Sequence, residues 1–291
     1  MKFLLCGSSA RKLKREHANM LGGRAWRYEL YPLVYKEIPD FDLLRAFNHG
    51  LLPNHYLSSD YKKSLNSYII NYFKEEIQAE GYDRNLSNFS RFLDAVSFQI
   101  GELVNFTNIS SDCGVSSRTI KEYYQILIDT FLGFYLYPFV NSPGRNSIIS
   151  APKFYFFDIG LGNSLSKQYI RQLKGPVAGK NFENFIFMEL KAFNSYFEKY
   201  MEINFWRTKS GLEVDFIINK GQLLIETKIS GNINKNDLKG LIALASEIKT
   251  GKMLVVCNEK RKRIITLDDS KEIFIYPWRE FLDGLWNNKI I

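Results

Sequence analysis

The chain has 291 residues, of which 45% are hydrophobic, so it can bury a sizeable core and does not have the composition of a disordered protein. Its net charge of +8 is compatible with a nucleic-acid partner but does not require one. Three widely spaced cysteines form no metal-binding motif, which argues against structural zinc and for a reducing compartment. The most apolar stretch, residues 126–140, contains Asp129 and Pro138 and is too short to span a bilayer, so we expect a cytoplasmic protein that does not enter a membrane.

The first part of the chain predicts mainly helices. Residues 3–9, FLLCGSS, predict a short buried strand that runs into a polar turn. Residues 59–77 predict a helix, because Ser59 or Asp60 can cap it and an apolar stripe follows at helical spacing. Residues 86–137 predict several short helices.

Residues 108–131 have helix-turn-helix character. Gly114 is placed in the turn, and Ser116 or Ser117 can cap a second helix. The face that would read DNA offers Arg118 and Lys121 as candidate contacts, which Glu122 offsets. A winged-helix-like segment that only packs against neighbouring domains is an equally good interpretation.

The second half predicts an α/β sandwich. A strand is expected at residues 154–157, and residues 180–197 form a strongly amphipathic helix with Glu183 at the edge of its apolar stripe. Strands at 203–208, 252–258 and 272–278, a hairpin, and a helix at 237–248 follow, which predicts a mixed sheet. The inward side of the long helix consists of Phe182, Ile186, Leu190, Phe193 and Phe197.

The hairpin is predicted within residues 211–228, GLEVDFIINKGQLLIETK. Both arms are rich in β-branched and apolar residues, and Lys220-Gly221 makes a good two-residue turn because glycine tolerates positive φ. This turn pairs Asn219 with Gln222. A loop one residue longer would mix charged and apolar residues on both faces, so the pattern supports this register.

The predicted register gathers four charges on one face of the hairpin. Asp215 lies opposite Glu226, and Glu213 lies opposite Lys228. Opposed carboxylates repel, and Mg²⁺, which takes carboxylate and phosphate oxygens, would remove that repulsion. Lys228 could then hold the attacking water or stabilise charge on a phosphorane. The simpler alternative is an amphipathic hairpin whose outer face carries a Glu213–Lys228 salt bridge. The other face carries Val214, Phe216, Ile218, Leu223 and Ile225.

A basic run follows the hairpin at residues 260–263, Lys-Arg-Lys-Arg. Either a phosphate-binding patch or a solvated loop between strands accounts for it.

The region from the long helix to the strand at 252–258 resembles the PD-(D/E)XK nuclease superfamily, whose core is a helix, a three-stranded meander and a crossover helix. The matching residues are Glu183, Asp215 and the run Glu226-Thr227-Lys228. The resemblance implies that Asp215 and Glu226 bind Mg²⁺, that Glu183 aids metal binding, and that Lys228 assists the attacking water.

A wider resemblance covers nearly the whole chain. Ordered blocks, including PKFYFFDIGL, NFENFIFMEL and FWRTKSGLEVDFI, look like a prokaryotic family that joins an AAA-type ATPase domain to a C-terminal nuclease-like domain of unknown function. The chain has neither a P-loop nor a Walker B strand, so the resemblance implies a C-terminal fragment without a complete ATP site. The implied domains are an ATPase remnant (1–35), a helical lid-like segment (36–80), a winged-helix-like domain (81–150) and the nuclease-like domain (151–291).

The sequence therefore predicts an α/β protein that cleaves DNA phosphodiester bonds with Mg²⁺. The alternative is a non-catalytic DNA- or protein-binding module that regulates the ATPase, and a third is a decayed gene product without activity. The expected partners are DNA and either the missing ATPase half or a second copy of the chain.

Overall fold

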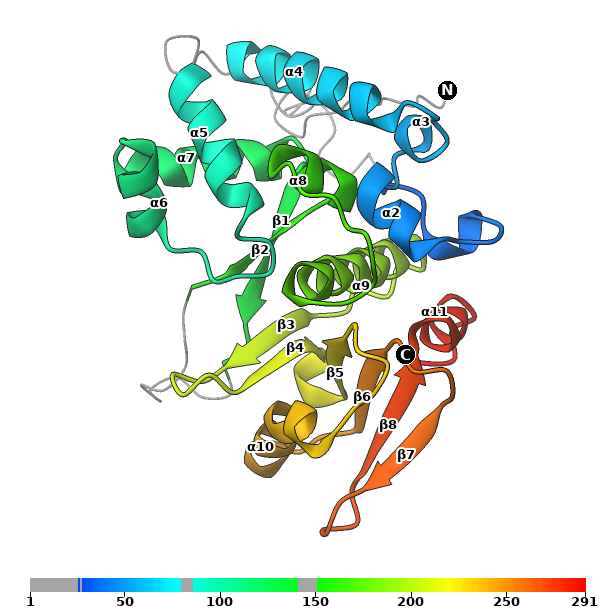
Figure 1. Ribbon diagram of the computed structural model, residues 1–291. Coiled ribbons are helices and arrows are strands. Elements are labelled where there is room, and N and C mark those ends of the chain that lie inside the picture. Colours follow the sequence, from blue (N-terminus) through cyan, green and yellow to red (C-terminus); the bar gives the residue numbers. More distant parts are fainter. Residues whose placement is uncertain (1–25, 27, 80–85, 141–150) are drawn as a thin grey trace.

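The computed structural model describes residue 26 and residues 28–79, 86–140 and 151–291 (Figure 1). The fold is mixed α/β, as the sequence predicted. The predicted strand at 3–9 lies outside the described residues, as does most of the predicted ATPase remnant. Among the described helices, none combines the length and hydropathy needed to cross a membrane.

One mixed sheet of eight strands organises the molecule. The strands are β1 (Gly133–Pro138), β2 (Lys153–Phe156), β3 (Ile203–Arg207), β4 (Glu213–Ile218), β5 (Leu223–Lys228), β6 (Lys252–Cys257), β7 (Arg263–Thr266) and β8 (Glu272–Pro277). Their order is β2-β1-β3-β4-β5-β6-β8-β7. Strands β3, β4 and β5 form an antiparallel meander, whereas β5, β6 and β8 are parallel. Strands β1 and β2, on either side of the predicted boundary at residue 150, pair with each other, and β1 pairs in parallel with β3.

The helices lie mostly on the β1–β2 side of the molecule and on both faces of the sheet (Figure 1). They are α2 (Leu43–His49), α3 (Pro53–Tyr56), α4 (Tyr61–Ala79), α5 (Leu86–Ser97), α6 (Phe106–Cys113), α7 (Ser117–Asp129), α8 (Ile159–Leu165), α9 (Pro176–Tyr196), α10 (Lys239–Glu247) and α11 (Trp278–Trp286). Short 3₁₀ turns occur at Tyr35–Glu37, Asn219–Gly221 and Lys235–Leu238.

Two hydrophobic cores sandwich the central strands. The larger core joins α9 and α11 to one face and continues into the helices from α2 to α8. The smaller core lies between α10 and the other face. This arrangement of helix, meander, crossover helix and parallel strand is the order that the sequence predicted for this region.

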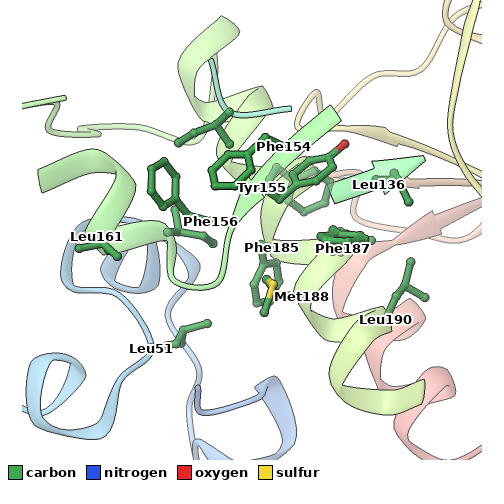
Figure 2. Close-up of a cluster of buried hydrophobic side chains, with 14 of the residues drawn as sticks. Leu51, Leu136, Phe154, Tyr155, Phe156, Leu161, Phe185, Phe187, Met188 and Leu190 are labelled. Atoms are coloured by element: carbon green, nitrogen blue, oxygen red, sulfur yellow. The ribbon is translucent and has the colours of Figure 1, made fainter. Parts of the chain in front are cut away.

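Aromatic residues of β2 attach the strand to its neighbours on both sides (Figure 2). Phe154 contacts Phe156 and Tyr124 with ring centroids 5.2 and 5.1 Å apart. Tyr155 faces the other way, and its ring lies 4.5 Å from that of Phe187 in α9. Because side chains alternate along a strand, Lys153 shares the face of Tyr155 and also points toward α9.

The helices predicted from local signals are present. Helix α4 matches the predicted 59–77 helix, and α6 and α7 are joined at Gly114, whose φ of +67° suits glycine. Ser116 caps α7 by accepting a hydrogen bond from Thr119 N. The prediction that Phe197 points inward is wrong. Helix α9 ends at Tyr196, and Phe197 follows it with 44% of its surface exposed.

Candidate active site

The hairpin of β4 and β5 has the predicted register where the two strands pair, but the predicted pairs Asp215–Glu226 and Glu213–Lys228 are not among the described pairs. Phe216 pairs with Ile225, and Ile218 pairs with Leu223. Lys220 and Gly221 both have positive φ, 59° and 104°, as a type I′ turn requires. The turn chemistry therefore fixes which residues of the two strands face each other.

An irregularity in β4 changes which residues share a face. The register between β3 and β4 shifts by one residue near Trp206. Val214 consequently packs in the α10 core with Ile217, whereas Phe216 and Ile218 pack in the α9 core. The prediction that Val214 shares a face with Phe216 and Ile218 is therefore wrong, because strict alternation does not survive a β-bulge.

Asp215 lies at this irregularity and is buried. Its Oδ2 accepts two hydrogen bonds of 2.7 Å from Thr227, one from the backbone N and one from the hydroxyl. The described pairing of β4 with β5 ends at Phe216. Beyond that point, the carboxylate of Asp215 accepts the hydrogen bond of the Thr227 amide. Its Oδ1 has no hydrogen bond to the described part of the chain and lies 4.0 Å from Lys153 Nζ.

Glu226 and Lys228 form a close ion pair at the end of β5. Lys228 Nζ lies 2.5 Å from Glu226 Oε1. Glu226 is only 5% exposed, and its Oε2 is buried without a hydrogen-bond donor among the described residues. Burial, and then Asp215, raise the pKa of Glu226 well above its usual value, although Lys228 opposes this. Burial alone lowers the pKa of Lys228, but Glu226 and Asp215 outweigh it, so the pKa of this ammonium is raised.

Glu213 does not pair with Lys228. Its described ion pairs are with Lys153 and with Arg207, whose Nη1 lies 3.4 Å from Glu213 Oε2. The Glu213–Lys228 salt bridge of the simpler interpretation is therefore not observed. Glu213 instead pairs with the buried Lys153 and the partly buried Arg207.

Lys153 was not predicted from the sequence. It begins β2, it is 1% exposed, and its Nζ lies 2.7 Å from Glu183 Oε1 and in direct contact with Glu213. Burial lowers the pKa of its ammonium. Negative charge nearby, first on Glu183 and then on Tyr155, Asp215 and Glu213, outweighs burial, so the pKa is raised well above its usual value. One signal was available, since a single lysine opens an otherwise aromatic strand in PKFYFF.

Glu183 is held by the neighbouring side chains of β2. Its Oε1 accepts hydrogen bonds from Lys153 Nζ at 2.7 Å and from the Tyr155 hydroxyl at 2.5 Å. Burial and Asp215 raise its pKa to about 7, against the lowering effect of Lys153 and Tyr155. Glu183 leans over the sheet, as expected from its position in the helix, and its described contacts are to Lys153 and Tyr155 of β2.

The carboxylates offer two places for a cation. Oxygens of Glu183, Glu213 and Asp215 lie within 4.8 Å of one another, and Lys153 Nζ already contacts two of these residues. Outside that group, Glu226 Oε2 is buried without a hydrogen-bond donor in the described structure, and Asp215 is close enough to Glu226 to raise the pKa of Glu226. Mg²⁺ commonly takes one or two carboxylates and completes its shell with water and phosphate, and Lys153 already supplies a positive charge to the first group but not to Glu226.

The two candidate DNA contacts lie elsewhere. Arg118 is exposed and pairs with Glu122 at 3.3 Å, and Lys121 Nζ lies 5.3 Å from the centre of the Phe106 ring. Neither has a described contact with the carboxylate cluster. Their role in DNA binding stays a prediction.

Two family models match the chain, and both describe a domain of unknown function: DUF8612 at residues 40–170 and DUF4143 at residues 178–280. An uncharacterized protein of Methanocaldococcus jannaschii, MJ1544, is 25% identical over 311 residues, which cover 92% of this chain and 66% of that protein. The chain thus spans slightly less than two thirds of this relative. The comparison with solved structures found no match. Lys153 belongs to the first matched segment, whereas the acids belong to the second.

Proposed function

We propose that Asp215, Glu226 and Lys228 form a Mg²⁺-dependent site that hydrolyses phosphodiester bonds in DNA. The observation that carries this proposal is the buried Oε2 of Glu226, which has no hydrogen-bond donor among the described residues, together with a second buried carboxylate, Asp215, that raises the pKa of Glu226. Leaving a buried polar atom without a partner costs about 1–3 kcal/mol, and more for a charged group. A bound cation is one partner that would satisfy such a carboxylate oxygen.

The two acids would hold the ion through Asp215 Oδ1 and Glu226 Oε2. When bound, Mg²⁺ would supply charge neutralisation and polarise the oxygens of a phosphate or a water. Thr227 fixes the orientation of Asp215 through its two hydrogen bonds. Glu226 is oriented by Lys228, so both carboxylates are positioned before any ligand arrives.

Lys228 acts through its charge in this proposal. Its raised pKa keeps it protonated, so it can donate hydrogen bonds but cannot remove a proton from water. Its side chain is 34% exposed, which leaves the ammonium accessible to a substrate phosphate. During hydrolysis a bond forms from water oxygen to phosphorus and a phosphorus–oxygen ester bond breaks, while a water proton passes to solvent and the leaving oxygen takes a proton from solvent. The ammonium stabilises negative charge that develops on the phosphoryl oxygens.

The surroundings of Lys228 favour a polyanion as substrate. Lys228 pairs with Cys257, so the ends of β5 and β6 lie side by side. The basic run at 260–263 lies in the connection that follows β6, which ends at Cys257. Lys260 and Arg261 of this run are exposed. A run of exposed cations next to the site is suited to phosphate contacts along a nucleic-acid strand.

A second candidate function is a non-catalytic DNA- or protein-binding module. The observation that favours it is Lys153, which already neutralises part of the acidic cluster without a metal ion. In this alternative the charges stabilise the junction between β2, α9 and β4 and perform no chemistry.

The test is cleavage of supercoiled plasmid and of branched DNA with and without Mg²⁺. Lys228→Met keeps the aliphatic stem but removes the charge, so the variant should remain folded and lose at least about 100-fold in rate, as in other losses of a charge-stabilising donor. Glu226→Gln should also abolish cleavage, whereas Lys252→Met, at the exposed start of β6, should not change it. Cleavage that survives both site substitutions equally comes from a contaminating nuclease, and then the non-catalytic module becomes the better account.

A further inference from the structure

Lys153 occupies the centre of the acidic cluster. Its Nζ lies 2.7 Å from Glu183, contacts Glu213 directly, and is 4.0 Å from Asp215. These three residues are also the group whose carboxylate oxygens come close enough together to hold a metal ion. The ammonium is therefore located where a cation bound by these acids would lie.

We propose that Lys153 is a built-in cation that takes the place of a divalent ion among Glu183, Glu213 and Asp215, so that only the place at Asp215 and Glu226 is left for a metal. The first part of this inference is independent of the proposed nuclease function. The second part rests on it, because it assigns the single ion to the proposed site.

The packing around Lys153 holds its ammonium in this position. The residue is completely enclosed, and its Nζ lies 5.5 Å from the centre of the Phe205 ring, where the ring face attracts a cation. Tyr155, two residues further along β2, donates to the same Glu183 oxygen as Lys153 does. Figure 2 shows that the ring of Tyr155 lies near Phe187 of α9, which anchors this face of β2 to the helix that carries Glu183.

The cluster is built from two parts of the chain. In the described structure, strand β2 joins the sheet through β1, which pairs with β3. The acids come from α9 and β4. Lys153 is thus a positioning residue that is supplied by the segment before α9. Its Nζ lies 4.0 Å from Oδ1 of Asp215, farther than from the carboxylate of Glu183.

The inference predicts different behaviour for two substitutions of the same residue. K153A removes the cation and opens space for a hydrated ion, so it should gain one Mn²⁺ per chain relative to the wild type in a calorimetric titration. K153M removes the cation but fills the same space with an apolar side chain, so it should gain none. A purely structural lysine would make both variants less stable without any change in the number of ions bound.

The acids identify where the gained ion binds. In the K153A background, E183Q should weaken the gained ion at least tenfold, whereas E226Q should leave it unchanged. In the wild type, E183Q should change Mn²⁺ affinity less than threefold, and E226Q should abolish the ion at the proposed site. If the wild type binds no Mn²⁺ but K153A gains one, the proposed nuclease site fails and the role of Lys153 stands.

A variant that does not fold still leaves the inference testable. If K153A is unfolded without metal, Mn²⁺ should restore its circular-dichroism spectrum, and K153M should not respond. K153A/E213Q removes one anion together with the cation and should fold without metal while still gaining one weaker ion. Absence of a gained ion in both K153A and K153A/E213Q would overturn the inference, as would a wild type that binds an ion lost on E183Q but not on E226Q.

Discussion

Asp215 and Thr227 are joined by two hydrogen bonds of 2.7 Å that end on one oxygen, Oδ2 of the carboxylate. Thr227 is the middle residue of the run Glu226-Thr227-Lys228, between two charged residues. Its hydroxyl and amide hold the acid of the opposite strand through Oδ2, while Oδ1 lies 4.0 Å from Lys153 Nζ. The contact between β4 and β5 therefore continues through a side chain after the backbone pairing has ended.

Replacing the Thr227 hydroxyl should release part of this restraint. Thr227→Val keeps the shape and the backbone amide but removes one hydrogen bond to a charged acceptor, which contributes about 1.5–3 kcal/mol. We expect the free energy of unfolding in urea to fall by that amount and Mg²⁺ affinity to decrease as well. Thr266→Val, on the exposed strand β7, is the control and should change stability by less than about 0.5 kcal/mol. Equal stability of the two variants would show that the hydroxyl does not hold Asp215.

A divalent ion at Asp215 and Glu226 should stabilise the folded state. Binding at ten times the dissociation constant contributes about 1.4 kcal/mol, so Mn²⁺ or Mg²⁺ should raise the melting temperature by a few degrees. Asp215→Asn should abolish the increase, and Asp269→Asn, an exposed acid paired with Lys271, should retain it. If Asp215→Asn shows the same increase as the wild type, the ion binds at another place or without specificity.

Glu189 presents a separate buried carboxylate. It lies on α9, is 2% exposed, and accepts hydrogen bonds from Tyr35 N at 2.7 Å and Trp286 Nε1 at 2.6 Å. Burial raises its pKa to about 8, more than these two donors lower it. It connects α9 to the chain before α2 and to the C-terminal helix α11.

This carboxylate should make stability depend on pH. Between the unfolded pKa near 4.5 and the folded pKa of about 8, the folded state keeps a proton that the unfolded state has lost. The contribution to stability is therefore fully present below about pH 4.5 and declines by about 1.4 kcal/mol per pH unit until pH 8. Urea unfolding from pH 6 to 9 should show a shallower decline for Glu189→Gln than for the wild type. A parallel pH dependence in both proteins would show that Glu189 ionises normally in the folded state.

The residues near the turn and the helix ends were predictable because their signals are local. Lys220-Gly221 determines the hairpin register through backbone conformation, and Ser116 and Gly114 determine where α7 begins and α6 ends through capping. The same local pattern predicted Asp215, Glu226 and Lys228 as site residues, which stays a prediction, and the hairpin brings the two strands that carry them side by side.

Only the tertiary structure decided what surrounds those residues. Lys153 reaches Glu183 across 30 residues because β1 pairs in parallel with β3 and carries β2 to the sheet, and no periodicity in the sequence encodes such a pairing. The bulge in β4 likewise separates Val214 from Phe216, although their spacing predicts one face. A hydrophobic pattern specifies which side chains avoid water, whereas the position of a buried charge depends on which opposite charges the completed fold places around it.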